Sequence, residues 1–565
     1  MLASLVLLTG GCASRPVGSA AANPATVAPA LVDPAKRAEA YYAFSLAQQA
    51  IEQGDAGSAL QLVAHAIELD PGSPYLYTFR AGLELSRRDV AAGTRSLQEA
   101  LRVNPFYPAA LYMYGGLMVA LGRVDEAIAS YERALAADSG SLDVYLYLVD
   151  LYLQKQDLGR ARAMATRMVE QFPAMAQGYY YRAKVHLLEG KTADALDQLQ
   201  AALERDPQNE EVLFALGSLL EKEGRAAEAT ELYRKQLDQM PDNLRLRDHL
   251  VSLYLQAEDW DRAEQENAEL ASLGYDPATV ERNRGVIAMG RQNYQDAIRA
   301  FEQALVAEPG DDRSRYSIGM AQLRLRRYDE ALDAFGRIEP ASELYPDGRF
   351  GVGYTYREMG RAQDALGELE TAIEQAPDRD EFRRLHALTL ADLGRFDDAE
   401  KELRELIDRN SDDLSYRFSL GAVYEKARRF DDGVKLMKDV LKRDPDNSDA
   451  HNYIGYTYAD QGVRLDEAEA DLNKAIAKKP GDPFISDSLG WLYYRQGRTR
   501  EALAKLLEAA GKVPDEPVIL QHLGVVYQAL GERDKARQSL EKALSLAKDP
   551  KLHEEIAGQI RALQP

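Results

Sequence analysis

Cysteine is almost absent from this chain, because Cys12 is the one cysteine among 565 residues. A disulfide needs two cysteines and a thiolate metal cluster needs several, so both are excluded. Positive charge is also scarce, since 69 lysine and arginine residues face 91 acidic ones and leave a net charge of −22. Proteins that bind nucleic-acid backbones present a basic face, so this charge balance argues against nucleic-acid binding. We interpret the acidity mainly as a source of solubility.

The motifs that carry common enzyme chemistry are missing as well. Seven histidines are spread between His65 and His553, and none forms the His-Glu-x-x-His pattern of a zinc site. The segment 351–353 lacks the third glycine of a dinucleotide loop, and the segment 444–448 lacks the glycine and distal glutamate of a calcium loop. No Gly-x-Ser-x-Gly or Gly-Lys-Ser/Thr motif occurs. We therefore predict no catalytic residue, no cofactor and no metal, and a protein that is not an enzyme.

One motif does recur, most clearly between Ser448 and Leu544. Each copy has a large aliphatic residue, a glycine, a tyrosine and then an alanine at fixed distances: Ile454, Gly455, Tyr458 and Ala468; Leu489, Gly490, Tyr493 and Ala502; Leu523, Gly524, Tyr527 and Ala536. With a period of 34 residues and a closing proline, this motif resembles the tetratricopeptide repeat, in which each unit is a pair of helices. The resemblance implies an all-α fold.

The repeat can be followed along most of the chain. Stepping by its period, with one inserted residue near 462–464, gives units that start at Ala40, Pro74, Pro108, Leu142, Ala176, Glu210, Leu244, Ala278, Asp312, Pro346, Asp380, Leu414, Ser448, Pro483 and Pro517. We predict a right-handed superhelical solenoid of about fifteen helix pairs that is continuous over residues 40–550. Residues 551–565 are predicted to form a helix that caps the last pair.

Places within a unit are counted from its first residue, and each recurring residue type has a physical role. Small residues at places eight and twenty let the two helices of a pair approach closely. Glycine at place fifteen supplies the left-handed residue that ends the first helix, as at Gly224 and Gly394. The closing proline stops the second helix. Two irregular segments, 274–277 and 340–346, are candidate points where the array flexes, but ordinary degeneracy of the repeat is the explanation that we favour.

The first residues resemble the signal of a bacterial lipoprotein. A seven-residue run, apolar or small, from Leu2 to Leu8 is followed by Thr9-Gly10-Gly11-Cys12, which resembles a lipobox. The run is too short to span a bilayer and lies at the lower limit for the apolar region of a signal peptide. Unlike the family pattern, no lysine or arginine precedes the run, and Leu8 lies four residues before the cysteine instead of three. The resemblance implies that residues 1–12 form the signal and that Cys12 carries the lipid.

Residues 13–39 are rich in alanine and proline and are predicted to form a disordered tether. In bacterial lipoproteins an aspartate directly after the cysteine favours the inner membrane, so Ala13 implies the periplasmic side of the outer membrane. The alternative is a cytoplasmic protein with an apolar N-terminus that is not a signal.

The resemblance also implies a binding groove. In this family the first helix of each unit points its second, fifth, ninth and twelfth places into the concave face. Carried over unit by unit, these places hold Tyr41, Phe44, Tyr75, Tyr112, Tyr180, Phe214, Tyr316, Phe350, Tyr354, Phe418, Asn452, Tyr456, Asp487, Trp491, Tyr494 and Gln521. Aromatic residues with scattered polar groups suit the capture of an extended or helical segment of another protein. Each of these aromatics is almost as well explained by packing between helices.

Three functions are compatible with this sequence. We favour a lipid-anchored envelope scaffold that binds other proteins during envelope assembly, secretion or exopolysaccharide export. A second hypothesis is a glycan-binding export module whose aromatic groove stacks on sugars. A third is a cytosolic adaptor without an anchor.

Overall fold

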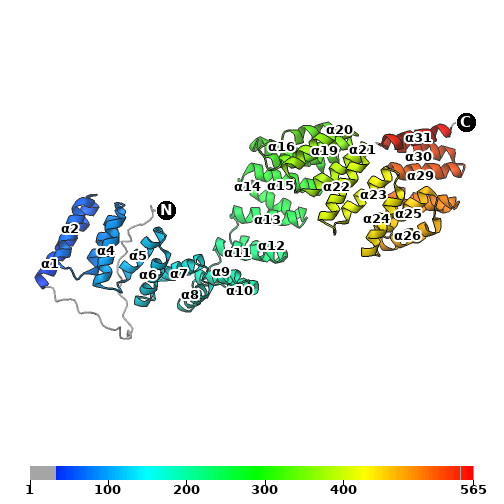
Figure 1. Ribbon diagram of the computed structural model, residues 1–565. Helices are drawn as coiled ribbons and strands as arrows, with labels where there is room; N and C mark the ends of the chain where they lie inside the picture. The colour runs from blue at the N-terminus through cyan, green and yellow to red at the C-terminus, as the bar shows by residue number, and fades with distance from the viewer. Residues whose placement is uncertain (1–32, 548, 564–565) are drawn as a thin grey trace. The chain divides into compact units, whose positions relative to one another are not determined.

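A computed structural model describes residues 33–547 and 549–563. Thirty-one helices and no strand occur in these ranges, so the all-α prediction is confirmed. The helices alternate as first and second members of fifteen pairs, and α31 follows the last pair (Figure 1). None of the described helices has both the length and the apolar character that crossing a membrane requires. The predicted signal and Cys12 lie outside the described residues.

The chain divides between Pro241 and Asp242 into two compact units. The first unit contains α1 (Pro34–Glu52), α2 (Ala56–Leu69), α3 (Pro74–Ser86), α4 (Val90–Val103), α5 (Pro108–Ala120), α6 (Val124–Ala137), α7 (Leu142–Gln154), α8 (Leu158–Gln171), α9 (Ala176–Leu188), α10 (Thr192–Arg205), α11 (Glu210–Lys222) and α12 (Ala226–Leu237). The predicted continuity of the array across this division stays a prediction.

The second unit holds the remaining helices. They are α13 (Leu244–Gln256), α14 (Trp260–Ser272), α15 (Pro277–Gly290), α16 (Tyr294–Ala307), α17 (Asp312–Arg324), α18 (Tyr328–Gly336), α19 (Tyr345–Glu358), α20 (Ala362–Gln375), α21 (Asp380–Asp392), α22 (Phe396–Arg409), α23 (Leu414–Lys426), α24 (Phe430–Arg443), α25 (Ser448–Gln461), α26 (Leu465–Lys478), α27 (Pro483–Arg495), α28 (Thr499–Lys512), α29 (Pro517–Ala529), α30 (Arg533–Leu546) and α31 (Pro550–Ala562). Helix α18 is the shortest of the described helices and lies just before the irregular segment 340–346.

The first helix begins earlier than predicted. Helix α1 starts at Pro34, so residues 34–39 belong to a helix and not to the predicted tether. The cause is local, because the Asp33 carboxylate accepts a hydrogen bond from the amide of Ala35 at 3.0 Å and Pro34 occupies the first turn. A capping aspartate followed by proline is a helix start signal. At the other end α31 forms as predicted and buries Ile556 against the last pair.

The turn between the two helices of a pair requires a left-handed residue in every unit. The backbone φ angle is positive at place fifteen throughout, whether the residue is glycine, as at Gly224, or another type, as at Arg326. Since a side chain in this conformation costs roughly 1 kcal/mol, the turn geometry outweighs the residue's own preference. The predicted insertion also lies here, because Gly462 and Arg464 are both left-handed in the turn between α25 and α26.

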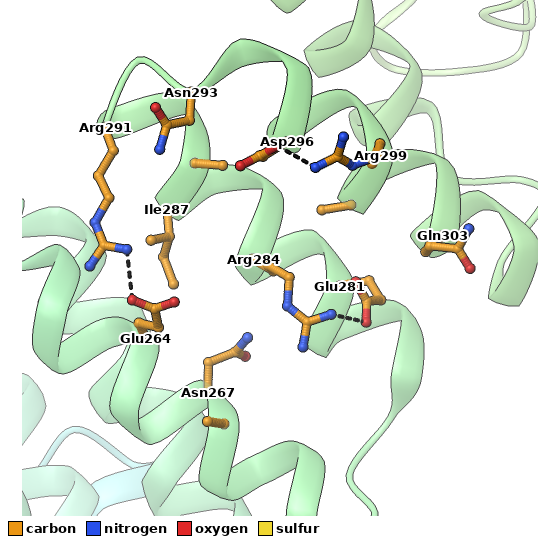
Figure 2. A pocket seen from close by; sticks show the side chains of 13 residues that line it. Glu264, Asn267, Glu281, Arg284, Ile287, Arg291, Asn293, Asp296, Arg299 and Gln303 are labelled. Carbon is orange, nitrogen blue, oxygen red and sulfur yellow. Dashed lines mark hydrogen bonds and ion pairs between the residues drawn. The ribbon is translucent and has the colours of Figure 1, made fainter.

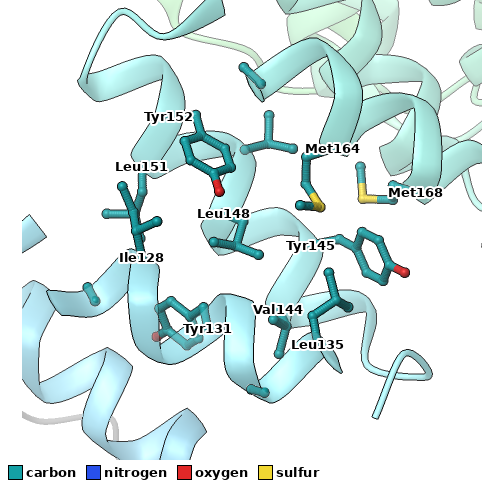
Figure 3. Packing of buried hydrophobic residues seen from close by; sticks show 14 of the residues in the cluster. Ile128, Tyr131, Leu135, Val144, Tyr145, Leu148, Leu151, Tyr152, Met164 and Met168 are labelled. Carbon is teal, nitrogen blue, oxygen red and sulfur yellow. The ribbon is translucent and has the colours of Figure 1, made fainter. Parts of the chain in front are cut away.

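Close approach of the paired helices is confirmed at place eight. A Cβ atom added to Gly490 in α27 would lie 2.7 Å from Cγ of Leu506 and 3.2 Å from the carbonyl oxygen of Ala502, both in α28. These distances leave no room for a side chain. Around such contacts the apolar residues of successive helices form a series of buried clusters along each compact unit. Figure 3 shows part of it in the first unit, where Tyr131 of α6, Leu148 of α7 and Met168 of α8 are buried together.

Neighbouring pairs are also joined by partly buried ionic contacts. Glu400 in α22 accepts hydrogen bonds from the Tyr424 hydroxyl at 2.7 Å, from Arg404 at 2.8 Å and from Arg429 at 2.5 Å. Tyr424 and Arg429 belong to the next repeat. Burial alone would raise the pKa of Glu400, but these three donors outweigh it and hold the pKa below its ordinary value of 4.5.

We expect Gly490→Ala to destabilise the α27–α28 pair by about 1–3 kcal/mol, because the added methyl group overpacks the contact with Leu506. The measurement is amide hydrogen exchange over residues 483–512. Gly511→Ala in α28 is the matched control, since nothing lies within 4 Å of its added Cβ, and its protection should stay equal or rise. Equal protection in both variants would contradict the close approach.

A second prediction concerns acid. Because the pKa of Glu400 is lowered in the folded state, its stabilisation is present above the pKa of the unfolded chain and is lost as the pH falls through the folded value. Glu400→Gln should therefore be less stable than wild type at pH 7 in urea unfolding, and the difference should shrink as the pH falls below about 4. Glu405→Gln, on the exposed side of α22, controls for the loss of a surface charge. A difference that persists at low pH would refute this role.

Candidate partner-binding surfaces

The predicted groove residues differ widely in exposure. Tyr41, Tyr75, Tyr112 and Tyr354 are exposed, with Tyr41 at 68%. Phe44, Tyr180, Phe214, Tyr316, Phe350, Phe418, Asn452, Tyr456, Trp491 and Tyr494 are partly buried. Asp487 and Gln521 are buried, at 5% and 6% exposure, and they contact neighbouring side chains instead of solvent. Exposure alone therefore separates surfaces that can meet a partner directly from residues that position others.

In the first compact unit many aromatic side chains pack against one another. The Phe44 ring meets that of Tyr75 edge-on at 5.2 Å, and the Tyr131 and Tyr147 rings stack at 5.3 Å. Tyr112 lies edge-on to both members of that stack and stays exposed. Packing between helices thus explains part of this set, as the sequence allowed. The exposed tyrosines remain available for contact with a flat apolar surface or a sugar face.

Tyr180 is held by a charged neighbour. Its hydroxyl donates to a carboxylate oxygen of Glu211, one unit further on, at 2.8 Å. Burial and this hydrogen bond raise the pKa of Tyr180 to about 12. The ring is therefore fixed between two first helices of adjacent units. It serves the interface between units at least as much as a groove.

The first helices of the last three repeats, α25, α27 and α29, bring a different group of side chains together. In α27 the Asp487 carboxylate lies 2.9 Å and 3.1 Å, by its two oxygens, from Nδ1 of His522 in α29. The imidazole in turn stacks on the Trp491 indole, with ring centroids 4.2 Å apart and planes at 14°. Trp491 also stacks on Tyr494 at 5.2 Å. A buried acid–base pair therefore fixes the aromatic side chains of this wall.

His522 is a functional candidate that the sequence pattern misses, because it occupies place six and not an inner place. Its ring also lies 6.4 Å from the ring of Tyr456 in α25, so it links three successive first helices. Gln521, next to it, donates to Glu555 at 3.0 Å and to Gln559 at 3.3 Å in α31. The capping helix is thus connected to the same wall. We call the side chains Tyr456, Asp487, Trp491, Tyr494 and His522 the C-terminal aromatic cluster.

The aromatic cluster lies in a strongly acidic setting. Burial and the charges of Asp460, Glu425, Asp487 and Glu555 raise the pKa of Tyr456. Two polar atoms of this region, Oδ1 of Asn452 and Nε1 of Trp491, are buried without a hydrogen-bond partner. Leaving such groups unpaired costs about 1–3 kcal/mol each.

A separate pocket of about 560 Å³ lies between α14, α15 and α16. Arg284, Arg291 and Arg299 line it, and each pairs with a carboxylate, as Figure 2 shows. Hydrogen bonds to Glu264 and Asp261 raise the pKa of Arg291. Because every one of these guanidinium groups already has a partner, the pocket is balanced in charge and offers no fixed site for an anion.

One of the polar residues that line this pocket, Asn267, departs from the repeat pattern. Place twenty-four, which lies in the second helix, is apolar or tyrosine in every other repeat once the inserted residue near 462–464 is allowed for, as at Phe301 and Leu506, but it is asparagine in α14. Asn267 is buried, donates to the carbonyl oxygen of Val280 at 2.9 Å and accepts from Nδ2 of Asn283 at 3.1 Å. A polar contact therefore replaces the usual apolar one between α14 and α15.

Comparison with known proteins agrees with the repeat pattern. Three sequence models described as tetratricopeptide repeat match, and together they cover well over half of the chain. They match residues 80–141, 189–243, 282–348 and 418–483; residues 122–184, 220–278 and 356–422; and residues 518–550.

Individual relatives are more distant. The chain is 25% identical over 310 residues to cellulose synthase operon protein C of Pseudomonas fluorescens, covering 53% of this chain and 22% of that protein. It is 48% identical over 52 residues to a TPR repeat-containing protein of Pseudomonas aeruginosa, 9% of each chain. Among solved structures, yeast Tom70 is 16% identical with a TM-score of 0.40, covering 81% of this chain and 95% of that one. The chain spans only a minor part of the first two relatives.

The Asn267 contact yields a prediction. Asn267→Leu should destabilise the second unit by about 1–3 kcal/mol, because it leaves the amide of Asn283 without its partner. Replacing both residues by leucine should restore most of that stability, since apolar groups then fill the space on both sides. Denaturant unfolding of the two variants and hydrogen exchange over residues 260–290 measure this.

Gln303→Leu at the exposed edge of the same pocket is the control and should change stability by no more than about 0.5 kcal/mol. A double variant as unstable as the single one would show that the asparagine pair is not the unit that matters.

Proposed function

The chain belongs to the tetratricopeptide-repeat family, and on this premise we propose that it is a lipid-anchored, non-catalytic scaffold on the periplasmic side of a bacterial outer membrane. Repeats of this family form protein-interaction scaffolds, and the exposed first-helix side chains of both units are the surfaces that meet partners. The observation that carries the scaffold function is the recurrence of helix pairs over nearly all the described residues. The anchor and the compartment go beyond this and rest on the N-terminal residues.

Support for the anchor comes from the position of one residue. Cys12 is the only cysteine, and it falls directly after Gly10-Gly11 and the short apolar run. A thioether-linked lipid with a further acyl group supplies two apolar anchors, which suffice for stable membrane attachment where a single chain does not. The unpaired cysteine thereby has a chemical role that needs no disulfide partner.

Among the envelope processes, the similarity to cellulose synthase operon protein C favours exopolysaccharide export. The name of that relative places it in a cellulose synthase operon, and the similarity covers 53% of this chain. We propose that this scaffold holds components of an export or assembly machinery together. Envelope assembly and secretion are the two other processes that such a scaffold could serve.

A glycan-binding module is the second candidate, and the exposed tyrosines of the first unit favour it. Tyr75, Tyr112 and Tyr147 each leave more than a third of their surface accessible, and sugars stack on such rings. Stacking on a neutral glucan is insensitive to salt, whereas the acidic surface would bind protein partners with a marked salt dependence. Titration with neutral gluco-oligosaccharides at low and high salt separates the two.

The third hypothesis is a cytosolic adaptor. It differs from the other two in lacking the anchor.

The anchor gives a direct prediction. Wild-type protein produced in a Gram-negative host should incorporate labelled palmitate and sediment with outer membranes, and Cys12→Ala should do neither. Ala13→Asp is the matched variant, because it should keep the label but move the protein to the inner membrane. Equal labelling of wild type and Cys12→Ala would remove the anchor from the proposal and leave the cytosolic adaptor.

A further inference from the structure

In the last four repeats, no lysine or arginine occupies a place of the first helix that the family pattern points into the groove, and we call these places the inner places. Places five, nine and twelve of α23, α25, α27 and α29 hold Phe418, Ala422, Glu425, Asn452, Tyr456, Ala459, Asp487, Trp491, Tyr494, Gln521, Val525 and Gln528. Earlier first helices of the same compact unit differ, because Arg282, Arg357 and Arg384 occupy equivalent places there. The wall around the C-terminal aromatic cluster is therefore acidic and aromatic.

The geometry points to a basic partner: we propose that this wall binds a lysine- or arginine-bearing segment of another protein, with its cationic side chains beside Glu425, Asp460 and Glu555 and its apolar parts on Tyr456, Trp491 and Tyr494. This inference rests on the proposed scaffold function and names the chemistry of one partner. It also implies that this wall does not take a carboxylate-bearing chain end, which would need lysine or arginine at the inner places.

Among the described residues no ion pair joins Glu425 or Asp460 to a basic side chain, and Lys426, next to Glu425, pairs with Asp392 instead. Glu425 is exposed at the end of α23, and partial loss of hydration together with the charge of Asp460 raises its pKa in spite of the nearby charge of Lys426. Two like charges held near each other are costly, and an incoming ammonium or guanidinium group relieves that cost.

The basic side chain nearest to these carboxylates on α27 does not remove the imbalance. Arg495 follows the inner place of Tyr494, and its guanidinium lies against the turn after α25, where a Cβ on Gly462 would be 2.4 Å from Nη2. It therefore lies at the edge of the wall and not among the inner places. A partner's lysine enters beside Glu425 and Asp460 without displacing it.

The aromatic part of the wall is rigid before any partner arrives. The Asp487–His522 contact fixes the imidazole, the imidazole fixes the Trp491 indole by stacking, and the indole meets Tyr494. Rings held in this way lose little conformational entropy on binding. The methylene groups of lysine or arginine pack well on such surfaces while their charged ends reach the carboxylates.

A basic polypeptide segment fits this wall better than a simple cation. Lysine and arginine offer methylene groups that pack on the rings of Trp491 and Tyr494 and a charged end that meets the carboxylates. A metal ion supplies the charge but no apolar surface. The occupant is thus a segment of protein that carries positive charge.

The test uses tryptophan fluorescence, because the chain has only Trp260 and Trp491. In the full-length chain carrying Trp260→Phe, Trp491 alone reports on the wall. The probes are acetylated and amidated hexapeptides that differ only in two central residues: lysine, glutamine or glutamate. We expect the lysine peptide to change the Trp491 emission with at least fivefold tighter binding than the glutamine peptide, and this advantage to fall between 50 and 500 mM salt, as screening requires.

Charge-neutral variants separate the wall from the overall acidity of the chain. Glu425→Gln with Asp460→Asn should weaken binding of the lysine peptide about tenfold, because it removes both unpaired carboxylates. Asp534→Asn with Glu541→Gln removes two exposed charges from the second helix α30 and should leave the affinity unchanged. Calorimetry confirms the result without relying on fluorescence.

Equal binding of the lysine, glutamine and glutamate peptides would overturn the proposal, and so would an equal loss in the two double variants. A response to neutral gluco-oligosaccharides in place of the lysine peptide would overturn it in favour of the glycan module. The scaffold function fails separately, when wild-type protein crosslinked in cells joins no envelope protein through either unit.

Discussion

The structure depends above all on how closely the two helices of a pair approach. At place eight a glycine such as Gly217 faces the ring of Tyr233, and an added Cβ would lie 1.9 Å from its hydroxyl oxygen. Such contact distances fix the spacing of the pair and thereby the direction in which each next pair is added. The apolar core grows lengthwise because each pair buries its faces only on its neighbours. The inner places are the positions of the first helix that are not used in the contact between the two helices of a pair.

The sequence predicts this fold almost completely, because its repeated places each have one physical role. What it could not predict follows from tertiary constraint overriding residue type. Arg326 adopts a left-handed conformation that nothing in an arginine favours, because the turn requires it. The start of α1 was within reach, since Asp33 before Pro34 is a helix start signal. It was missed because composition made the whole alanine- and proline-rich segment look like a tether.

The sequence predicts the proposed binding wall only in outline. Inner places identify Trp491 and Tyr494, but they also select Asp487, which is buried and orients His522. That pairing joins place five of one unit to place six of the next, and only the offset between adjacent helices brings these places together. The Asn267 contact could have been found by comparing the residues at place twenty-four across units. The sequence therefore named residues of the proposed surface, whereas their contacts with one another follow only from the structure.

A scaffold of this kind separates stability from recognition. Leu506 and Gly490 hold the pair together and tolerate little change, whereas an inner residue such as Glu425 is exposed and takes no part in the core. Unlike charges set at inner places along one array can therefore select unlike partners while the helix pairs stay the same. The acidic wall of α23 to α29 and the arginine-bearing first helices before it are two such settings within one compact unit. Specificity in this molecule then comes from the sequence of charges and rings along its first helices.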